Sequence, residues 1–103
     1  MPLLPITGLY LRYALLLVLD AHGGRSCSVC QLLDGLAHLG LAPRGERPSK
    51  VVSDALRWEV ARGRARRCGR DRYSVGHLPG VTRHRAQVVV RCLRSGEPPP
   101  LCP

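Results

Sequence analysis

The chain has 103 residues, which suits one folded domain and leaves no room for two. Apolar residues make up 45% of it, which is enough to build a hydrophobic core and too many for a disordered chain. Aromatic residues account for only 4%, so Leu, Val and Ala must form that core, and the net charge of +9 favours a polyanionic partner.

The N-terminal residues predict an irregular leader followed by a helix. Two prolines and a glycine interrupt residues 1–8. A helix is expected over residues 9–21, with Thr7 as its N-cap and two glycines after its end. Leucines at helical spacing give this helix one apolar face, formed by Leu11, Leu15, Leu16 and Leu19.

The same apolar run is a poor candidate for a membrane or secretory segment. Residues 9–19 are too few to span a bilayer, which needs about 20 residues. A signal peptide carries positive charge before its apolar run, whereas no Lys or Arg precedes this one. We therefore expect a buried helix in a cytoplasmic protein with no membrane segment.

A short strand and a second helix are expected next. Residues 25–28 form a short segment that we expect to pair as a brief strand. Ser28 and Gln31 match a capping box, in which each side chain satisfies a free backbone N–H of the other residue. The helix is expected to end near Leu39, before Gly40. Its apolar stripe consists of Val29, Leu32, Leu33, Leu36 and Leu39.

Residues 41–47 read as a loop, and the third helix is expected over residues 48–62. Pro48 suits the first turn of a helix, where its missing N–H costs nothing, and Gly63 ends the helix. The helical wheel directs Val52, Ala55, Leu56 and Val60 inward, and Lys50, Ser53, Asp54, Arg57 and Ala61 outward. Glu59 also falls on the inward side, where we expect it to pair with an Arg of the following strand.

Residues 64–75 predict a β-hairpin that turns at Gly69–Asp71. Its inner face is expected to carry Ala65, Tyr73 and Val75. A linker over residues 77–80 leads to a fourth helix, capped by Thr82 and ending near Arg94. The inward side of that helix is expected to carry Ala86, Val89, Val90 and Leu93. The proline-rich residues 95–103 predict a disordered tail.

Five cysteines form no disulfide framework and are expected to be reduced thiols. Cys27-x-x-Cys30 has the spacing of half a zinc site, but such a site needs four ligands and no second pair follows. We favour Cys30 as a small apolar residue in the core and Cys27 as a residue at a helix start. No metal, cofactor or catalytic constellation is expected, and nothing in the sequence indicates an enzyme.

The positive charge is concentrated in the second half of the chain. Residues 1–43 carry no net charge, whereas residues 44–94 contain thirteen Arg and one Lys against four acidic residues, a net charge of +10. This distribution favours a neutral scaffold joined to a surface that binds a polyanion. A basic surface that only aids solubility is the alternative.

The expected order of elements is helix, short strand, helix, helix, hairpin, helix, and it resembles the winged helix-turn-helix family. The resemblance is sharpest over residues 49–75, SKVVSDALRWEVARGRARRCGRDRYSV. Leu56 and Gly63 have the spacing of many such domains, and Tyr73 fits the aromatic that closes the hairpin. Glu59 departs from the family, which more often has an apolar residue there. The charge distribution also resembles the globular domain of linker histones.

The resemblance implies a mainly α fold with a small β-hairpin (α+β): a three-helix core, a two-stranded wing and a C-terminal helix over residues 9–94. It also implies that the third helix and the wing bind double-stranded DNA, as in a small transcription regulator or a nucleoid-associated protein. Arg57 is the best candidate to read a guanine, or else to contact a phosphate. The candidate nucleic-acid-binding residues are Ser49, Lys50, Ser53, Arg57, Arg64, Arg66, Arg67, Arg70 and Arg72.

Several alternatives stay open at this point. The wing arginines also suit a charged edge that prevents strand-to-strand aggregation. The arginines of the fourth helix suit either a solvent face or a further backbone contact, and any homodimer is expected to form through that helix. A winged-helix module that binds an acidic protein is the second functional hypothesis, and a small zinc protein is the third.

Overall fold

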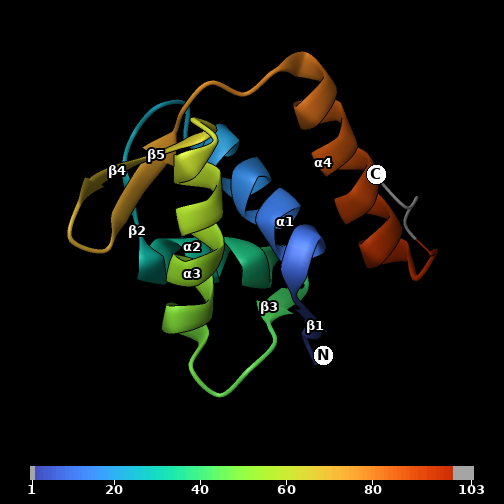
Figure 1. Ribbon diagram of the computed structural model, residues 1–103. Coiled ribbons are helices and arrows are strands. Elements are labelled where there is room, and N and C mark those ends of the chain that lie inside the picture. The colour runs from blue at the N-terminus through green and yellow to red at the C-terminus, as the bar shows by residue number, and fades with distance from the viewer. Residues whose placement is uncertain (1, 99–103) are drawn as a thin grey trace.

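Helix α1 (Gly8–Ala21) runs through the middle of the molecule, and the other helices pack around it (Figure 1). The computed structural model describes residues 2–98. Helices α2 (Val29–His38) and α3 (Pro48–Ala61) contact α1 and each other, and α4 (Gly80–Ser95) packs along α1. The α+β architecture with four helices is therefore confirmed.

A three-stranded antiparallel sheet joins the hairpin to the segment before α2. Strands β4 (Ala65–Gly69) and β5 (Arg72–Val75) form the hairpin, and β2 (Cys27–Ser28) adds to its inner edge in the order β2-β5-β4. The expected hairpin and short strand are thus confirmed, although β2 is two residues long and does not extend back to residue 25. The left-handed backbone of Asp71, with φ of 56°, closes the turn.

A second, two-stranded parallel sheet lies where an irregular leader and a loop were expected. Strand β1 (Leu4–Ile6) pairs with β3 (Leu41–Pro43), and the expectations for residues 1–8 and 41–47 are wrong over these residues. Ile6 and Leu41 are 4% and 1% exposed, so the pairing buries apolar side chains. Strands of three residues that contain proline show no alternating pattern, which hid them from the sequence analysis.

The helix starts agree with the sequence for α2 and for α3, which begins at Pro48, agree in part for α1 and differ for α4. The Ser28–Gln31 capping box is present, with Gln31 N donating to Ser28 Oγ at 3.1 Å and Ser28 N to Gln31 Oε1 at 2.8 Å. Thr7 is the N-cap of α1, but its hydroxyl makes no capping hydrogen bond. Helix α4 begins at Gly80 after Pro79, two residues before the expected cap Thr82, because Pro79 already fixes an extended backbone there.

The buried face of α3 is rotated slightly from the predicted one. Val52, Leu56 and Glu59 are fully buried, whereas Val60, which was expected inside, is 36% exposed. Ala55 lies at the margin of the core. Val60 was expected inside because it is apolar, but the face of α3 that packs against α1, α2 and β4 carries Val52, Leu56 and Glu59, and Val60 lies outside it.

The C-terminal helix continues one residue further than expected. Ser95 belongs to α4, and Gly96 ends the helix with a left-handed φ of 79°. Buried side chains from α1, α4 and the segment before α4 form a second cluster beside the main core, made of Tyr13, Leu16, Leu78, Ala86 and Val89. Most of the predicted disordered tail, residues 99–103, lies outside the described residues.

Candidate nucleic-acid interface

The outward face of α3 carries two cations on either side of one carboxylate. Lys50 Nζ lies 2.9 Å from Asp54 Oδ2, and Arg57 Nη2 lies 4.0 Å from Asp54 Oδ1. The Arg57 side chain is 83% exposed. Ser49 and Ser53 are the hydroxyl residues expected at the interface: Ser49 is exposed and Ser53 is half-buried. The helix therefore presents hydrogen-bond donors to solvent, but Asp54 offsets part of their charge.

Asp54 stays ionised at neutral pH. The hydrogen bond from Lys50 holds the pKa of the Asp54 carboxyl below its ordinary value, and the positive charges of Lys50 and Arg57 act in the same direction. Asp54 therefore orients Lys50 and Arg57 along the helix. It also repels any phosphate that approaches the centre of this face.

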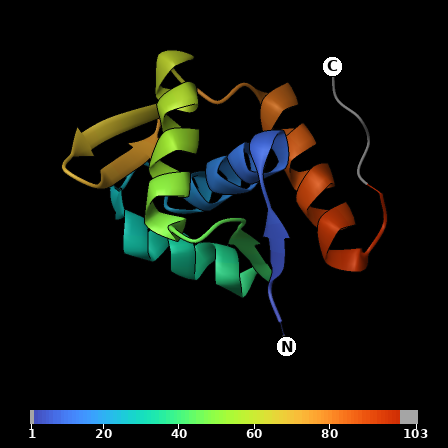
Figure 2. The same ribbon diagram turned by 60° about the horizontal axis from the view of Figure 1, so that its bottom comes forward.

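The hairpin beside α3 carries cations that no carboxylate neutralises. Arg66, Arg67 and Arg70 are all exposed, and among residues 2–98 no carboxylate oxygen lies within 4.0 Å of their guanidinium groups. Figure 2 shows the hairpin projecting from the side of α3 and away from α4. These three arginines extend the positive surface beyond the helix.

The hairpin is anchored to the body of the protein near its turn. Arg72 donates from Nε and Nη2 to Ser26 Oγ, at 3.3 and 3.2 Å. The backbone carbonyl of Asp71 accepts a 3.0 Å hydrogen bond from Val29 N at the start of α2. The turn is thus held against the strand and helix that precede α3, and the exposed arginines sit on a fixed support.

Arg64 has a different place from the other candidate residues. Its Nη2 donates to both carboxylate oxygens of the buried Glu59, at 2.5 and 2.6 Å. The side chain of Arg64 is only 21% exposed. The expected pairing of Glu59 with a following arginine is confirmed, and it removes Arg64 from the free cations of the hairpin.

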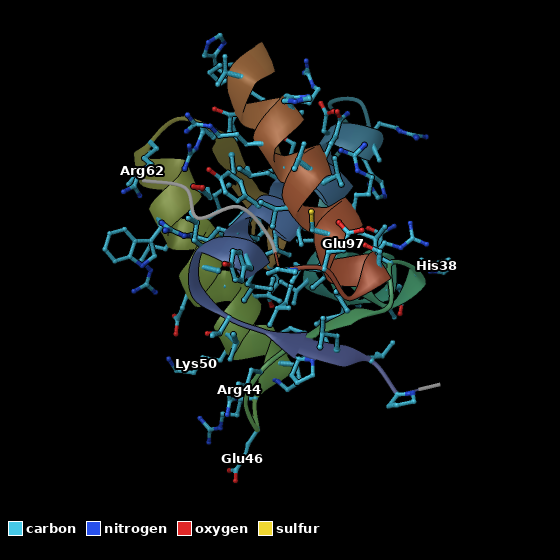
Figure 3. All side chains as sticks on the ribbon, turned by 90° about the vertical axis from the view of Figure 1, so that its right-hand side faces the viewer. His38, Arg44, Glu46, Lys50, Arg62 and Glu97 are labelled. Carbon is cyan, nitrogen blue, oxygen red and sulfur yellow. The ribbon has the colours of Figure 1, made fainter. Side chains whose placement is uncertain are left out.

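Arg12, Trp58 and Arg62 form a group that the sequence did not predict. The guanidinium carbons of Arg12, on α1, and Arg62, after α3, lie 5.6 and 5.4 Å from the centre of the Trp58 ring. Trp58 is 59% exposed. Figure 3 shows Arg62 and Lys50 at opposite ends of α3, so this group lies toward the C-terminal end of the helix. A tryptophan outside the apolar stripe of α3 was the signal that could have revealed it.

The arginines of α4 lie on another side of the molecule. Arg83 forms an ion pair with Asp20 at the end of α1, with Nε and Nη2 donating at 3.0 and 3.2 Å. Arg85, Arg91 and Arg94 are exposed. Helix α4 packs on the side of α1 opposite the hairpin, as both ribbon views show (Figures 1 and 2). These arginines therefore belong to a surface separate from α3 and the hairpin.

The cysteine pair is arranged differently from the expectation. Cys27 is fully buried, and burial raises the pKa of its thiol, whereas Cys30 is exposed. The assignment of Cys30 to the core was wrong, because the pairing of Cys27 with Tyr73 turns Cys27 inward. Within the part of the chain that the structure describes, no three His, Cys, Asp or Glu side chains gather as metal ligands.

Comparison of the chain with protein-family models, curated proteins and solved structures finds no match. None of the helices within residues 2–98 is long and apolar enough to cross a membrane. The geometry of α3 and the hairpin is therefore the main guide to function.

Proposed function

We propose that this protein is a winged-helix protein that binds double-stranded DNA. The order α1-β2-α2-α3-β4-β5-α4, with β5 in the centre of the sheet, supports this assignment. In this arrangement α3 is the recognition helix and the β4–β5 hairpin is the wing. The additional β1–β3 pair and α4 lie outside that framework.

The observation that carries the proposal is the set of unneutralised arginines beside α3. Arg66, Arg67 and Arg70 project from an anchored hairpin next to a helix that exposes Lys50 and Arg57. Duplex DNA presents closely spaced phosphates, and each cation that neutralises one of them releases condensed counterions. A fixed ribbon of arginines is suited to follow the phosphate backbone or to enter a narrow minor groove.

In this proposal α3 enters the major groove. A helix about 10–12 Å across fits a groove about 12 Å wide. Arg57 reads a guanine through its planar fork, and Asp54 either orients Arg57 or accepts from a cytosine amino group. Lys50, Ser49 and Ser53 contact the backbone. The protein then acts either as a small transcription regulator or as a nucleoid-associated protein.

A protein-interaction module that binds an acidic partner is the second candidate. The exposed Trp58 between two arginines favours it, because Trp and Arg are enriched among the residues that dominate binding at protein interfaces. The two functions share one fold, so only a binding measurement separates them.

The test is a gel-shift titration of a duplex at physiological salt, with two variants of equal charge. Arg66, Arg67 and Arg70 are changed together to Ala in one variant, and Arg85, Arg91 and Arg94 in the other. We expect saturable binding at micromolar concentration or below, which the hairpin variant loses and the α4 variant keeps. Equal losses would show that net charge alone drives binding, and no binding by the unmodified protein would leave the acidic partner.

Selection of bound sequences from a random DNA pool then separates the two DNA-binding roles. A regulator is expected to enrich a short motif, because Arg57 discriminates between base pairs. An architectural protein is expected to enrich none, because phosphate contacts carry no sequence information.

A further inference from the structure

A groove with an aromatic wall and two cationic edges lies between the start of α1 and one side of α3. Its volume is about 440 Å³, within the range of roughly 300–1,000 Å³ that is usual for small-molecule sites. Leu11 and Ala55 are among the residues that line it, and Trp58 forms an exposed wall. Arg12 and Arg62 line it as well, from two different segments.

The indole of Trp58 is only partly covered by the two arginines next to it. Both guanidinium carbons lie over the ring, within the cation–π range of about 6 Å from its centre. Arg62 is also hydrogen-bonded through Nη1 to the backbone carbonyl of Trp58, at 3.4 Å. Because Trp58 is 59% exposed, part of its indole remains open to solvent, with a positive charge over the ring from each of two elements.

The charges around the groove fit an anion. Asp54 also lines it, but the Asp54 carboxylate accepts the hydrogen bond of Lys50 and so is partly neutralised. Within residues 2–98 neither Arg12 nor Arg62 has a carboxylate within 4.0 Å. Because Asp54 belongs to both surfaces, the groove adjoins the outward face of α3.

We propose that this groove binds an unpaired nucleotide, whose base stacks on Trp58 and whose phosphates contact Arg12 and Arg62. Aromatic side chains next to cations are the usual components of single-strand binding, because every base has a π-face that can stack. The proposal rests on the function proposed above: α3 and the hairpin hold a duplex, and the groove takes a base from an adjoining single-stranded end.

The test compares three DNA probes that share one short duplex. The first is blunt, the second carries a single-stranded thymidine overhang, and the third carries an overhang of abasic residues, which keeps the phosphates and lacks the bases. We expect the thymidine overhang to raise affinity about tenfold, and the abasic overhang to raise it much less. Trp58 is the single tryptophan of the chain, so quenching of its fluorescence reports stacking directly.

Variants of exposed residues on α3 make the test specific. Trp58→Ala is expected to abolish the gain from the thymidine overhang and leave affinity for the blunt duplex unchanged, whereas Trp58→Phe keeps part of the gain. Val60→Ala, a change at another exposed apolar residue of the same helix, is the control and should keep all of it. Because Trp58 is 59% exposed, these variants are expected to fold.

Different results overturn the two proposals. Equal affinity for the blunt and overhang probes, or an equal gain from the abasic overhang, overturns base stacking while duplex binding stands. An acidic peptide that quenches Trp58 more strongly than a thymidine oligonucleotide overturns it as well and identifies the groove as a peptide site. If the blunt duplex does not bind but a thymidine oligonucleotide quenches Trp58, the duplex function is wrong and the nucleotide site stands.

Discussion

The Glu59 carboxylate and the Arg64 guanidinium form an ion pair at the junction between α3 and the hairpin, with Arg64 Nη2 at 2.5 and 2.6 Å from the two oxygens. The backbone reinforces this junction, because Arg64 N donates to Glu59 O at 3.0 Å and Gly76 N donates to Arg64 O at 2.8 Å. One residue pair thus links the last turn of the helix to both ends of the hairpin. Its role is to fix how the hairpin sits against α3.

Arg64→Ala is expected to destabilise the protein although Arg64 lies next to the wing. The change leaves the Glu59 carboxylate, which is 1% exposed, buried without a partner. Breaking a buried ion pair from one side costs about 3–5 kcal/mol. Urea denaturation measures the effect, and Arg66→Ala, at an exposed residue of the neighbouring strand β4, is the control. Equal stability of the two variants would show that Glu59 is solvated in solution.

Leu56→Ala is expected to lower the free energy of unfolding by about 2–5 kcal/mol. Leu56 is fully buried in the main core, where its methyl groups contact other apolar side chains. Such a loss is large against the roughly 5–15 kcal/mol of a small domain. Val60→Ala is the matched control, because Val60 is exposed on the same helix. A melting temperature that Leu56→Ala leaves unchanged would contradict the observed packing of α3.

The sequence predicted the elements that local patterns encode. The helices follow from apolar residues at helical spacing, and the Ser28–Gln31 capping box follows from residues three positions apart. The hairpin follows from its turn residues and its buried Ala65 and Tyr73. These features depend on neighbours along the chain, so one sequence is enough to find them.

The structural features that could not be predicted from the sequence depend on contacts between residues far apart in the chain. Strand β1 is recognisable only through its partner β3, and neither has enough residues to show a pattern of its own. The group around Trp58 likewise needs Arg12, which only the packing of α1 against α3 brings close. Arg64 was assigned to DNA because the sequence predicted that Glu59 pairs with an arginine of the following strand but did not show which arginine this is.

Asp54→Asn is expected to strengthen binding to DNA of random sequence several-fold. The change removes the carboxylate that Lys50 and Arg57 share, so both cations become free to meet phosphates. Since Lys50 lowers the pKa of Asp54, the carboxylate is ionised throughout the neutral range and the effect should not vary with pH there. Fluorescence anisotropy of a labelled duplex measures it, with Asp34→Asn on α2 as a control of equal charge. Weaker binding by Asp54→Asn would instead favour a direct contact of Asp54 with a base.

Arg57→Ala and Arg70→Ala are expected to differ in their dependence on DNA sequence. Arg57 lies on the outward face of α3, and its loss should cost about 1–3 kcal/mol on a preferred site and much less on random DNA. Arg70 lies at the hairpin turn, and its loss should weaken both DNAs alike. The measurement is the ratio of specific to random affinity for each variant. If both variants change this ratio equally, the proposed roles of α3 in base recognition and of the hairpin in phosphate contact are wrong.

The dependence of DNA affinity on salt tests the proposed function most directly. The net charge of residues 44–94 is +10, but the structure removes some cations from reach, because Arg64 is paired with Glu59 and Arg83 with Asp20. We therefore expect about four to seven phosphate contacts from α3 and the hairpin. With a slope near −0.9 per contact, log K should fall against log[salt] with a slope of about −4 to −6.

Single substitutions measure how much each residue contributes to the slope of log K against log[salt]. Changing Lys50, Arg66, Arg67 or Arg70 to Ala should flatten the slope by about 1 each if each residue meets a phosphate, whereas Arg91→Ala on α4 should leave it unchanged. An acidic protein partner releases no condensed counterions of a duplex, so its salt dependence should be shallower and less linear. The affinity for a short duplex is measured across a salt series. A slope near zero, or no binding at low salt, would end the DNA hypothesis and leave the acidic partner as the function to pursue.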